Sequence, residues 1–211
     1  PMRIRLSSID PLYVNDALIK IVAASDKIAK SLHIPLQSGS DRILAKMNRN
    51  YTQAYIRHML DRLNENIPDI GIGMDVIAGF PTEDEEAFEE TYNLLESVGV
   101  YYLHVFPFSA RAKTAASSME GGVPEVEIRN RVRRLKRLDS QKRQTFYKRF
   151  IGTEKFIIVE GKLYRKQYIR GYTENYIPVH IPYEKSLENK LVKVKITGVE
   201  DGMVIGRAAN G

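Results

Sequence analysis

A glutamine, a glycine and two serines stand where a predicted strand ends and a helix begins. In the segment LHIPLQSGSD, apolar residues alternate from Leu32 to Leu36, which is the period of a strand with one buried face. Gln37 ends this strand, and Ser40 or Asp41 is placed to cap the next helix. The carboxyl ends of parallel strands are where α/β folds bind ligands. A turn with a helix cap explains the serines and the glycine but not Gln37, so a binding site and a plain turn both stay open.

A second polar residue, Asp75, interrupts the apolar segment IGMDVIAGF, which predicts a buried strand. A buried carboxylate is costly unless it is paired, so Asp75 needs either a hydrogen-bonding ligand or an Arg or Lys from elsewhere in the fold. The chain has no cysteine, which excludes disulfides and any thiolate-bound metal or iron–sulfur cluster within it. Its histidines lack the spacing of metal ligands, so the sequence predicts no metal site from any of them: His33, His58, His104 and His180.

The residues up to 108 alternate predicted strands with predicted helices. Strands are expected at 2–8, up to Gln37, at 71–78 and at 100–108, and helices after Asp10-Pro11, at 41–48, at 53–66 and from an N-cap at Thr82. Such alternation makes parallel βαβ units, and four strands form either part of a barrel or an open sheet. The chain starts at Pro1 and has no apolar run of membrane length, so we expect a soluble piece of a longer protein.

Positive charge is concentrated in the carboxyl-terminal half. Residues 125–150 hold ten basic side chains against three acidic ones, residues 151–211 ten against seven, and residues 1–124 twelve against sixteen. A single helix from Pro124 to Phe150 is predicted to carry most of this charge. Its arginines are either a solvated face or contacts to the phosphates of a polyanion.

After Gly152 the sequence changes to five short strands separated by turns. Five strands in about sixty residues predict a small antiparallel barrel of the oligonucleotide-binding type. Tyrosines alternate with cations here, a pattern that suits stacking on single-stranded nucleic acid, although tyrosines also fill the walls of small barrels. The residues concerned are Tyr164, Arg165, Lys166, Tyr168, Arg170, Tyr172 and Tyr176.

With these features in place, the chain resembles the carboxyl-terminal two-thirds of the radical S-adenosylmethionine methylthiotransferases. Five segments carry the resemblance in the family's order: LHIPLQSGSD, MNRNYT, DVIAGFPTEDEEAFEET, HVFPFSARAKTAA and GYTENYIPV. The segments RIRLSSIDP, YYLHVFPFSARAKTAA and GYTENYIPV look most like the branch that acts on threonylcarbamoyladenosine in transfer RNA. The branches for isopentenyladenosine and for a ribosomal protein are less similar.

The resemblance implies two domains. Residues 1–150 would be the later part of a radical S-adenosylmethionine partial barrel, a TIM-like α/β fold, including the basic helix. Residues 152–211 would be a TRAM domain, a small RNA-binding barrel.

The resemblance also implies a set of cofactor contacts. Gln37 and Asp75 would bind the ribose of S-adenosylmethionine, and Arg49 would pair with its methionyl carboxylate unless it is only an exposed arginine at a helix end. Gly79 would allow a close backbone approach, and Ser8 is a weaker candidate.

Contacts to RNA are expected from basic and aromatic side chains beyond the last barrel strand. Arg111 and Lys113 would meet either a phosphate or the nucleoside's carboxylate, unless they form only a basic loop. The other expected contacts are Arg133, Arg134, Arg137, Arg165, Arg170, Tyr172 and Tyr176.

Full-length members of the family hold two 4Fe-4S clusters on cysteines that this chain lacks. We therefore expect the chain to bind no cluster and to be inactive alone. Its longer parent would insert a methylthio group at an unactivated carbon of a modified adenosine beside the anticodon. The implied partners are the anticodon stem-loop of transfer RNA, an iron–sulfur assembly system and an electron donor, in the cytoplasm and without a membrane.

Two other functions stay open. One is a stand-alone RNA-binding protein that has lost catalysis. The other is a non-radical α/β enzyme for a phosphorylated metabolite, which no glycine-rich phosphate loop supports.

Overall fold

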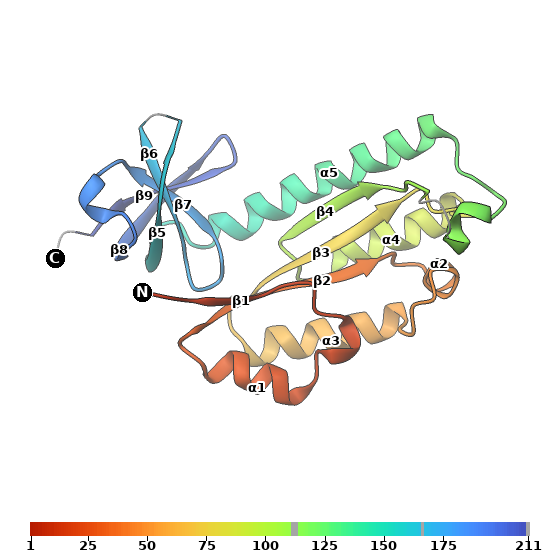
Figure 1. Ribbon diagram of the computed structural model, residues 1–211, viewed down its shortest axis with the longest axis horizontal. Coiled ribbons are helices and arrows are strands. Elements are labelled where there is room, and N and C mark those ends of the chain that lie inside the picture. The colour runs from red at the N-terminus through yellow and green to blue at the C-terminus, as the bar shows by residue number, and fades with distance from the viewer. Residues whose placement is uncertain (111–113, 166, 210–211) are drawn as a thin grey trace.

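Four parallel strands form the sheet that organises the first half of the chain (Figure 1). The computed structural model describes residues 1–110, 114–165 and 167–209. In spatial order the strands are β1 (Ile4–Leu6), β2 (Ile28–Gln37), β3 (Gly71–Ala78) and β4 (Tyr102–Pro107). The predicted parallel pairing is confirmed for all three neighbouring pairs. The helices that follow the strands are α1 (Asp16–Ala24), α2 (Asp41–Lys46), α3 (Gln53–Asn66), α4 (Glu85–Ser97) and α5 (Glu125–Lys148).

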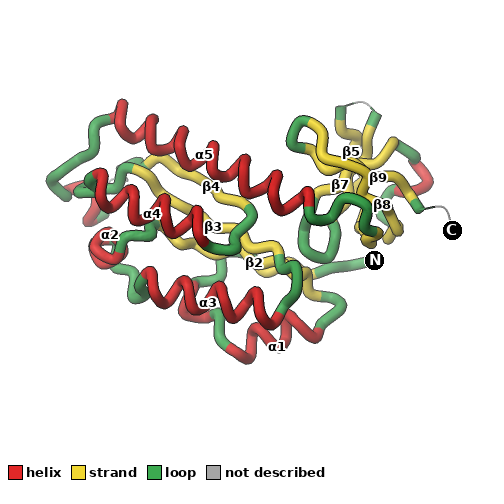
Figure 2. The backbone as a smooth tube through the Cα atoms, turned by 180° about the vertical axis from the view of Figure 1, so that it is seen from behind, coloured by secondary structure: helices red, strands yellow, loops and turns green. Residues whose placement is uncertain are grey.

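The main core lies between one face of this sheet and the helices, which stand in front of the strands in Figure 2. Alternate residues of the two central strands, such as Leu32 and Ile34 on β2 and Met74 on β3, are fully buried there. Because successive side chains of a strand point to opposite faces, the residues between them lie on the other face. That face carries His33, Asp75 and their neighbours.

One helix cap differs from the sequence prediction, and another lacks the expected side-chain hydrogen bond. The N-cap of α4 is Asp84, whose carboxylate accepts from Ala87 N–H at 2.9 Å, and not Thr82. Thr82 lies in the preceding turn with a φ of 70°, where its hydroxyl accepts from Lys46 Nζ. Ser40 precedes α2 as expected, but its side chain makes no capping hydrogen bond.

Beyond the sheet, five strands close into a small barrel in the order β5-β6-β7-β9-β8. They are β5 (Glu154–Tyr164), β6 (Tyr168–Tyr172), β7 (Pro178–Pro182), β8 (Leu191–Glu200) and β9 (Met203–Ala208). The predicted small antiparallel barrel is present, except that one of its strand pairs, β7 with β9, is parallel. An odd number of strands cannot alternate direction all the way around a closed ring, so one pair has to be parallel.

Helix α5 runs from the sheet to the barrel, as Figure 1 shows. Its last turn contributes Phe146 and Tyr147 to a second core that also contains Tyr101, next to the start of β4, and the inner side chains of the barrel. The remaining helical segments are short 3-10 turns, η1 (Pro11–Tyr13), η2 (Ala115–Ser118) and η3 (Lys185–Leu187). Within the described part of the chain, no helix combines the length and the apolar character needed to cross a membrane.

The loop between β6 and β7 fixes the barrel to the sheet. The side-chain amide of Asn175 donates to Asp69 O at 3.0 Å, and the backbone N–H of Lys30 donates to Glu174 O at 2.6 Å. A Cβ added to Gly71 would lie 2.3 Å from Asn175 O, so only glycine at the start of β3 allows this approach. The segment GYTENYIPV therefore docks the barrel at the amino ends of the strands, away from the end where Gln37 lies.

Candidate functional site

The structure separates Gln37 from the serines and the glycine that follow it. Gly39 N–H donates to Thr91 Oγ1 at 2.9 Å, and a Cβ at Gly39 would lie 2.7 Å from Thr91 Cα. Ser38 Oγ lies 3.2 Å from the same hydroxyl, so these small residues serve the packing of α4. Gln37 has a φ of 69° and no side-chain hydrogen bond to any described residue. The packing of the turn against α4 thus explains why Ser38 and Gly39 are small residues. It leaves the side-chain amide of Gln37 available to bind a ligand.

Gln37 and Arg49 line the same pocket at the carboxyl end of the sheet. The pocket has a volume of about 280 Å³ and a mostly apolar wall. Around it stand Gln37, Lys46, Met47, Asn48, Arg49, Ile77, Phe80, Phe108, Ala115, Ala116 and Met119. A guanidinium, a primary amide and apolar walls can together hold an anionic group, hydroxyls and a flat apolar ring.

Arg49 reaches this pocket through a well-fixed turn. The Tyr51 hydroxyl donates to the carbonyls of Pro35 and Leu36 at 3.0 and 3.1 Å, which ties the turn to the end of β2. Burial raises the pKa of Tyr51 to about 12, so the phenol stays a donor at neutral pH. The Arg49 guanidinium lies 3.8 Å from the Asp10 carboxylate and is one-third exposed, a loose contact that a stronger anionic partner can displace.

Two other predicted cofactor residues do not line this pocket. Ser8 is an exposed residue just after β1 with a φ of 56°. Gly79 has a φ of 85°, and a Cβ there would lie 2.4 Å from Ile128 on α5. The close approach that requires glycine at this position is therefore made by α5, and the predicted cofactor contacts of both residues stay predictions.

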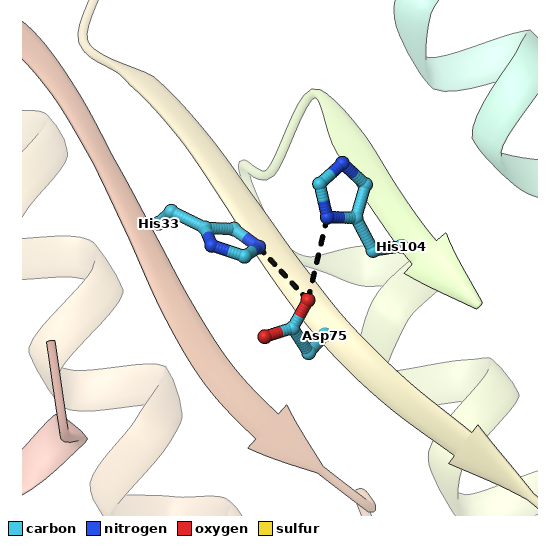
Figure 3. Close-up of side chains that lie close together, drawn as sticks. All are labelled: His33, Asp75 and His104. Atoms are coloured by element: carbon cyan, nitrogen blue, oxygen red, sulfur yellow. Dashed lines mark ion pairs between the residues drawn. The ribbon is translucent and has the colours of Figure 1, made fainter. Parts of the chain in front are cut away.

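Asp75 lies in the middle of β3, between two imidazoles (Figure 3). Its Oδ1 is 3.0 Å from His33 Nε2 and 3.4 Å from His104 Nδ1. Burial lowers the pKa of His33, and the nearby charges of His104 and Arg5 act in the same direction, against the Asp75 carboxylate. From the sequence, we expected this carboxylate to be paired with a ligand or with an Arg or Lys. In the structure, two histidines lie beside it instead. Contact with a ribose stays a prediction.

Spacing along the chain gave no sign of this cluster. Each of its members comes from a different strand, so their separations in sequence carry no ligand motif. The sequence pattern that could have indicated the cluster is the alternation of side chains along each strand. Each of the three residues is a polar residue on the side of its strand that faces away from the apolar core. Three such residues on adjacent parallel strands are candidates for contact.

Along α5, the predicted RNA-binding arginines fall into two groups. Arg133 and Arg137 are exposed, form no ion pair with a described residue and stand with Lys136 beside a concavity of about 750 Å³. Arg134 instead makes ion pairs with Glu85 and Glu89 and lies over the rings of Phe88 and Tyr92. Its charge is used within the fold, whereas that of the other two is free for an external anion.

In the barrel, the predicted aromatic and basic contacts are mostly engaged with one another. Tyr172 and Tyr176 stack at 4.3 Å between ring centroids, and Arg5 of β1 lies 4.0 Å from the centre of the Tyr176 ring. Arg170 pairs with Glu160 at 2.7 Å. Arg165 is exposed, with its guanidinium 5.8 Å from the Tyr164 ring. Arg111, Lys113 and Lys166 lie outside the described residues.

Comparison with known proteins gives this arrangement a family context. Residues 2–95 match the Radical SAM superfamily. The chain is 42% identical over 195 residues to threonylcarbamoyladenosine tRNA methylthiotransferase MtaB of Aquifex aeolicus and 39% identical over 197 residues to MtaB of Bacillus subtilis. It is also 34% identical over 206 residues to tRNA-2-methylthio-N(6)-dimethylallyladenosine synthase of Xylella fastidiosa strain 9a5c. These alignments cover 92%, 92% and 97% of this chain but only 45%, 44% and 41% of the relatives.

Among solved structures, coproporphyrinogen III oxidase (HemN) of Escherichia coli, a radical SAM enzyme, superposes with a TM-score of 0.51. It shares 18% sequence identity, and the match covers 72% of this chain and 34% of HemN. At that identity the likeness concerns the fold alone. The sequence matches make the chain similar to radical SAM methylthiotransferases, and it spans somewhat less than half the length of these curated relatives.

Proposed function

We propose that this chain is part of a cytoplasmic transfer-RNA methylthiotransferase and that it binds S-adenosylmethionine at the carboxyl end of its sheet. The observation that carries the proposal is the pocket in which the Gln37 amide and the Arg49 guanidinium face apolar walls. Ligands of parallel α/β folds bind at this end of the strands. The chemistry of the pocket agrees with the family match of residues 2–95.

Each chemical group of S-adenosylmethionine has a suitable partner among the residues that line the pocket. A guanidinium matches a carboxylate with two parallel hydrogen bonds, so Arg49 would exchange its loose contact with Asp10 for the methionyl carboxylate. An amide both donates and accepts, which suits the vicinal hydroxyls of a ribose next to Gln37. Ile77 and Phe80 supply an apolar wall for the adenine. When bound in the full-length protein, the cofactor supplies the radical that removes hydrogen from an unactivated carbon.

The iron–sulfur clusters of the family do not fit this chain. Such clusters are held by cysteine thiolates, and the sequence contains none. We therefore assign the clusters to the part of the relatives that this chain does not cover, and we derive no step through them. This chain's part would be to orient the cofactor and to hold the RNA.

For RNA we propose two surfaces. The first is the exposed face of α5 with Arg133, Lys136 and Arg137, which lies beside β4 and carries cations without internal partners among the described residues. The second is the barrel, which we propose to be a TRAM domain on account of its closed five-stranded architecture and its position after the basic helix. An anticodon loop presents unpaired bases, which lowers the cost of placing one against the sheet.

We further propose threonylcarbamoyladenosine as the substrate nucleoside. The two reported relatives that act on it are 42% and 39% identical to this chain, against 34% for the reported relative that acts on dimethylallyladenosine. The difference is modest. Dimethylallyladenosine is the alternative that an experiment has to separate from it.

The cofactor pocket is tested by substituting Arg49 and Gln37 in the full-length protein. Arg49→Ala should weaken S-adenosylmethionine binding tenfold or more, because a hydrogen bond to a charged group contributes about 1.5–3 kcal/mol. Gln37→Asn should also weaken it, since asparagine tolerates a positive φ but shortens the reach of the amide. Isothermal titration calorimetry measures both.

The matched control is Arg57→Ala on α3, which removes an arginine whose contact is with Ser97. This control should bind the cofactor as the wild type does. Equal affinity for the cofactor in Arg49→Ala, Gln37→Asn and the control would refute the assignment of the pocket.

A further inference from the structure

We propose that His33, Asp75 and His104 form a binding site for one divalent transition-metal ion of the Zn²⁺ class. The three side chains converge from β2, β3 and β4 on the face of the sheet that the main core does not use (Figure 3). The proposal does not rest on the proposed function, because it concerns binding of an ion by this chain alone. It also revises the expectation that these histidines hold no metal.

The separations of the donor atoms suit a single ion. All three lie within 4.8 Å of one another, and the two that involve the carboxylate measure 3.0 and 3.4 Å. Zinc binds nitrogen and oxygen at about 2.0–2.2 Å, so donors on two corners of a tetrahedron stand about 3.3–3.6 Å apart. The two separations that involve the carboxylate are near this value, while the two nitrogens, at no more than 4.8 Å from each other, would have to move only slightly to share an ion.

The contact between His33 and Asp75 is close but poorly directed. His33 is 6% exposed, and its Nε2 lies 3.0 Å from Asp75 Oδ1 without the geometry of a good hydrogen bond. A buried polar atom in a poorly directed contact calls for an explanation. A cation between the nitrogen and the carboxylate would be bound by both atoms.

The sheet holds the three ligands in place through its register. His33 is level with Gly73 and Tyr102 across the strands, and Asp75 is level with His104. A Cβ on Gly73 would lie 1.8 Å from the Tyr102 ring, so glycine makes room for that ring. Tyr102 in turn stacks on His33, with 5.8 Å between ring centroids and an angle of 12°. A side chain locked in this way is pre-positioned for a ligand.

The types of donor atom in the cluster determine which class of ion it can bind. Two imidazoles and one carboxylate suit Zn²⁺ and its neighbours Co²⁺, Ni²⁺ and Fe²⁺, whereas Mg²⁺ and Ca²⁺ prefer oxygen throughout. Three protein ligands leave one position for water or a substrate atom, as in catalytic rather than structural zinc sites. His104 is about half exposed, which gives this position an opening to solvent.

The experiment titrates Co²⁺ and then Zn²⁺ into the tag-free, metal-stripped chain. Co²⁺ bound by these ligands should give visible absorption bands that saturate at one equivalent and disappear when Zn²⁺ displaces it. Calorimetry with Zn²⁺ alone provides the affinity. Asp75→Asn and His104→Gln should each weaken binding at least tenfold.

His58→Gln is the matched control, because His58 is an exposed histidine on α3 outside the cluster. It should bind both ions as the wild type does. His104→Gln changes a half-exposed side chain and should leave the thermal unfolding of the ion-free protein unchanged, so it decides the matter if Asp75→Asn fails to fold. No saturable Co²⁺ spectrum in the wild type, or equal affinity in His104→Gln and the control, would overturn the proposal.

Discussion

At the scale of single residues, the buried pair of Glu83 and Arg131 shows why a count of charges misjudges a surface. The two side chains are 3% and 4% exposed and 2.8 Å apart, and Glu83 also accepts from Gly79 N–H. Burial raises the pKa of Glu83, while these hydrogen bonds act to lower it. A count of the basic helix includes Arg131 among its cations. The fold uses this arginine instead to hold α5 against the turn before α4.

Removing one partner of this pair should be costly. Arg131→Met leaves the buried carboxylate of Glu83 without its cation, and breaking a buried pair in this way destabilises a protein by about 3–5 kcal/mol. Urea unfolding measures the change in the free energy of unfolding. Arg133→Met is the control and should shift it by less than about 0.5 kcal/mol, since Arg133 is exposed.

The double variant Glu83→Gln with Arg131→Met separates charge from packing. It should recover part of the loss, because no unpaired buried charge remains. A loss in Arg131→Met no larger than in Arg133→Met would show that the pair contributes little to stability.

At the scale of elements, α5 presents two kinds of arginine that the sequence could not tell apart. The arginine spacing predicted a basic helix, and the helix is present. Which cations are free depends on where Glu85 and Glu89 of α4 lie, and that is decided by tertiary packing. Arg133 and Arg137 have no partner in the described chain, whereas Arg134 has two.

This division predicts unequal effects on RNA binding. Reversing Arg133 and Arg137 to glutamate should weaken binding of an anticodon stem-loop and flatten the dependence of log affinity on log salt. Each lost phosphate contact should reduce that slope by roughly 0.7 to 0.9. Arg134→Glu should mainly lower thermal stability. Gel-shift titrations at several salt concentrations give the slope, and an unchanged slope in the double reversal would mean that α5 is only a solvated connector.

The small barrel contains a histidine that should make its stability depend on pH. His180 is 5% exposed, and burial lowers its pKa, as do Arg170 and Arg165 nearby, against a hydrogen bond with Val204 O. The unfolded chain takes up a proton at about pH 6.5, while the folded chain resists it to lower pH. The unfolded state therefore binds more protons below that pH, and stability falls on acidification.

The corresponding measurement compares unfolding at about pH 8 and about pH 5.5. A single group of this kind changes stability by at most about 1.4 kcal/mol per pH unit. His180→Gln should reduce the loss on acidification, whereas the exposed control His58→Gln should not. An equal loss in wild type and His180→Gln would rule out this residue as the source.

Elements were predictable where a periodic pattern was strong. The bounds of α3 and β3 agree with those expected from the sequence, because both have sharp polar or glycine limits. The cap at Asp84 and the parallel pairing of β7 with β9 were not foreseen. The first depends on the path of a turn, and the second on the closure of a five-stranded ring.

At the scale of the whole molecule, the tyrosine-rich segment connects the two parts of the chain. Tyr172 and Tyr176 were expected to stack on bases, but here they stack on each other and on Arg5 of the first strand. Arg3 also donates to Tyr172 O at 3.1 Å. Stacking on bases stays a prediction, and the contacts within the chain depend on the docking of the barrel on the sheet, which the composition of the segment does not show.

The candidate sites also show that contacts between distant parts of the chain are hard to predict from the sequence. Gln37 and Arg49, twelve positions apart, were predicted to share a ligand, and the structure does bring them to one pocket. The cluster of His33, Asp75 and His104 spans three strands and appears only when the sheet is assembled. Long-range contacts of this kind leave no spacing pattern in the sequence.

The measurement that tests the central claim most directly is the nucleoside content of transfer RNA in the source organism after deletion of the gene that encodes this chain. Hydrolysed transfer RNA is analysed by liquid chromatography and mass spectrometry. The account predicts that methylthiolated threonylcarbamoyladenosine disappears, that its precursor without the methylthio group accumulates, and that methylthiolated dimethylallyladenosine is unchanged. Loss of the dimethylallyl product instead, or no change in either nucleoside, would contradict it.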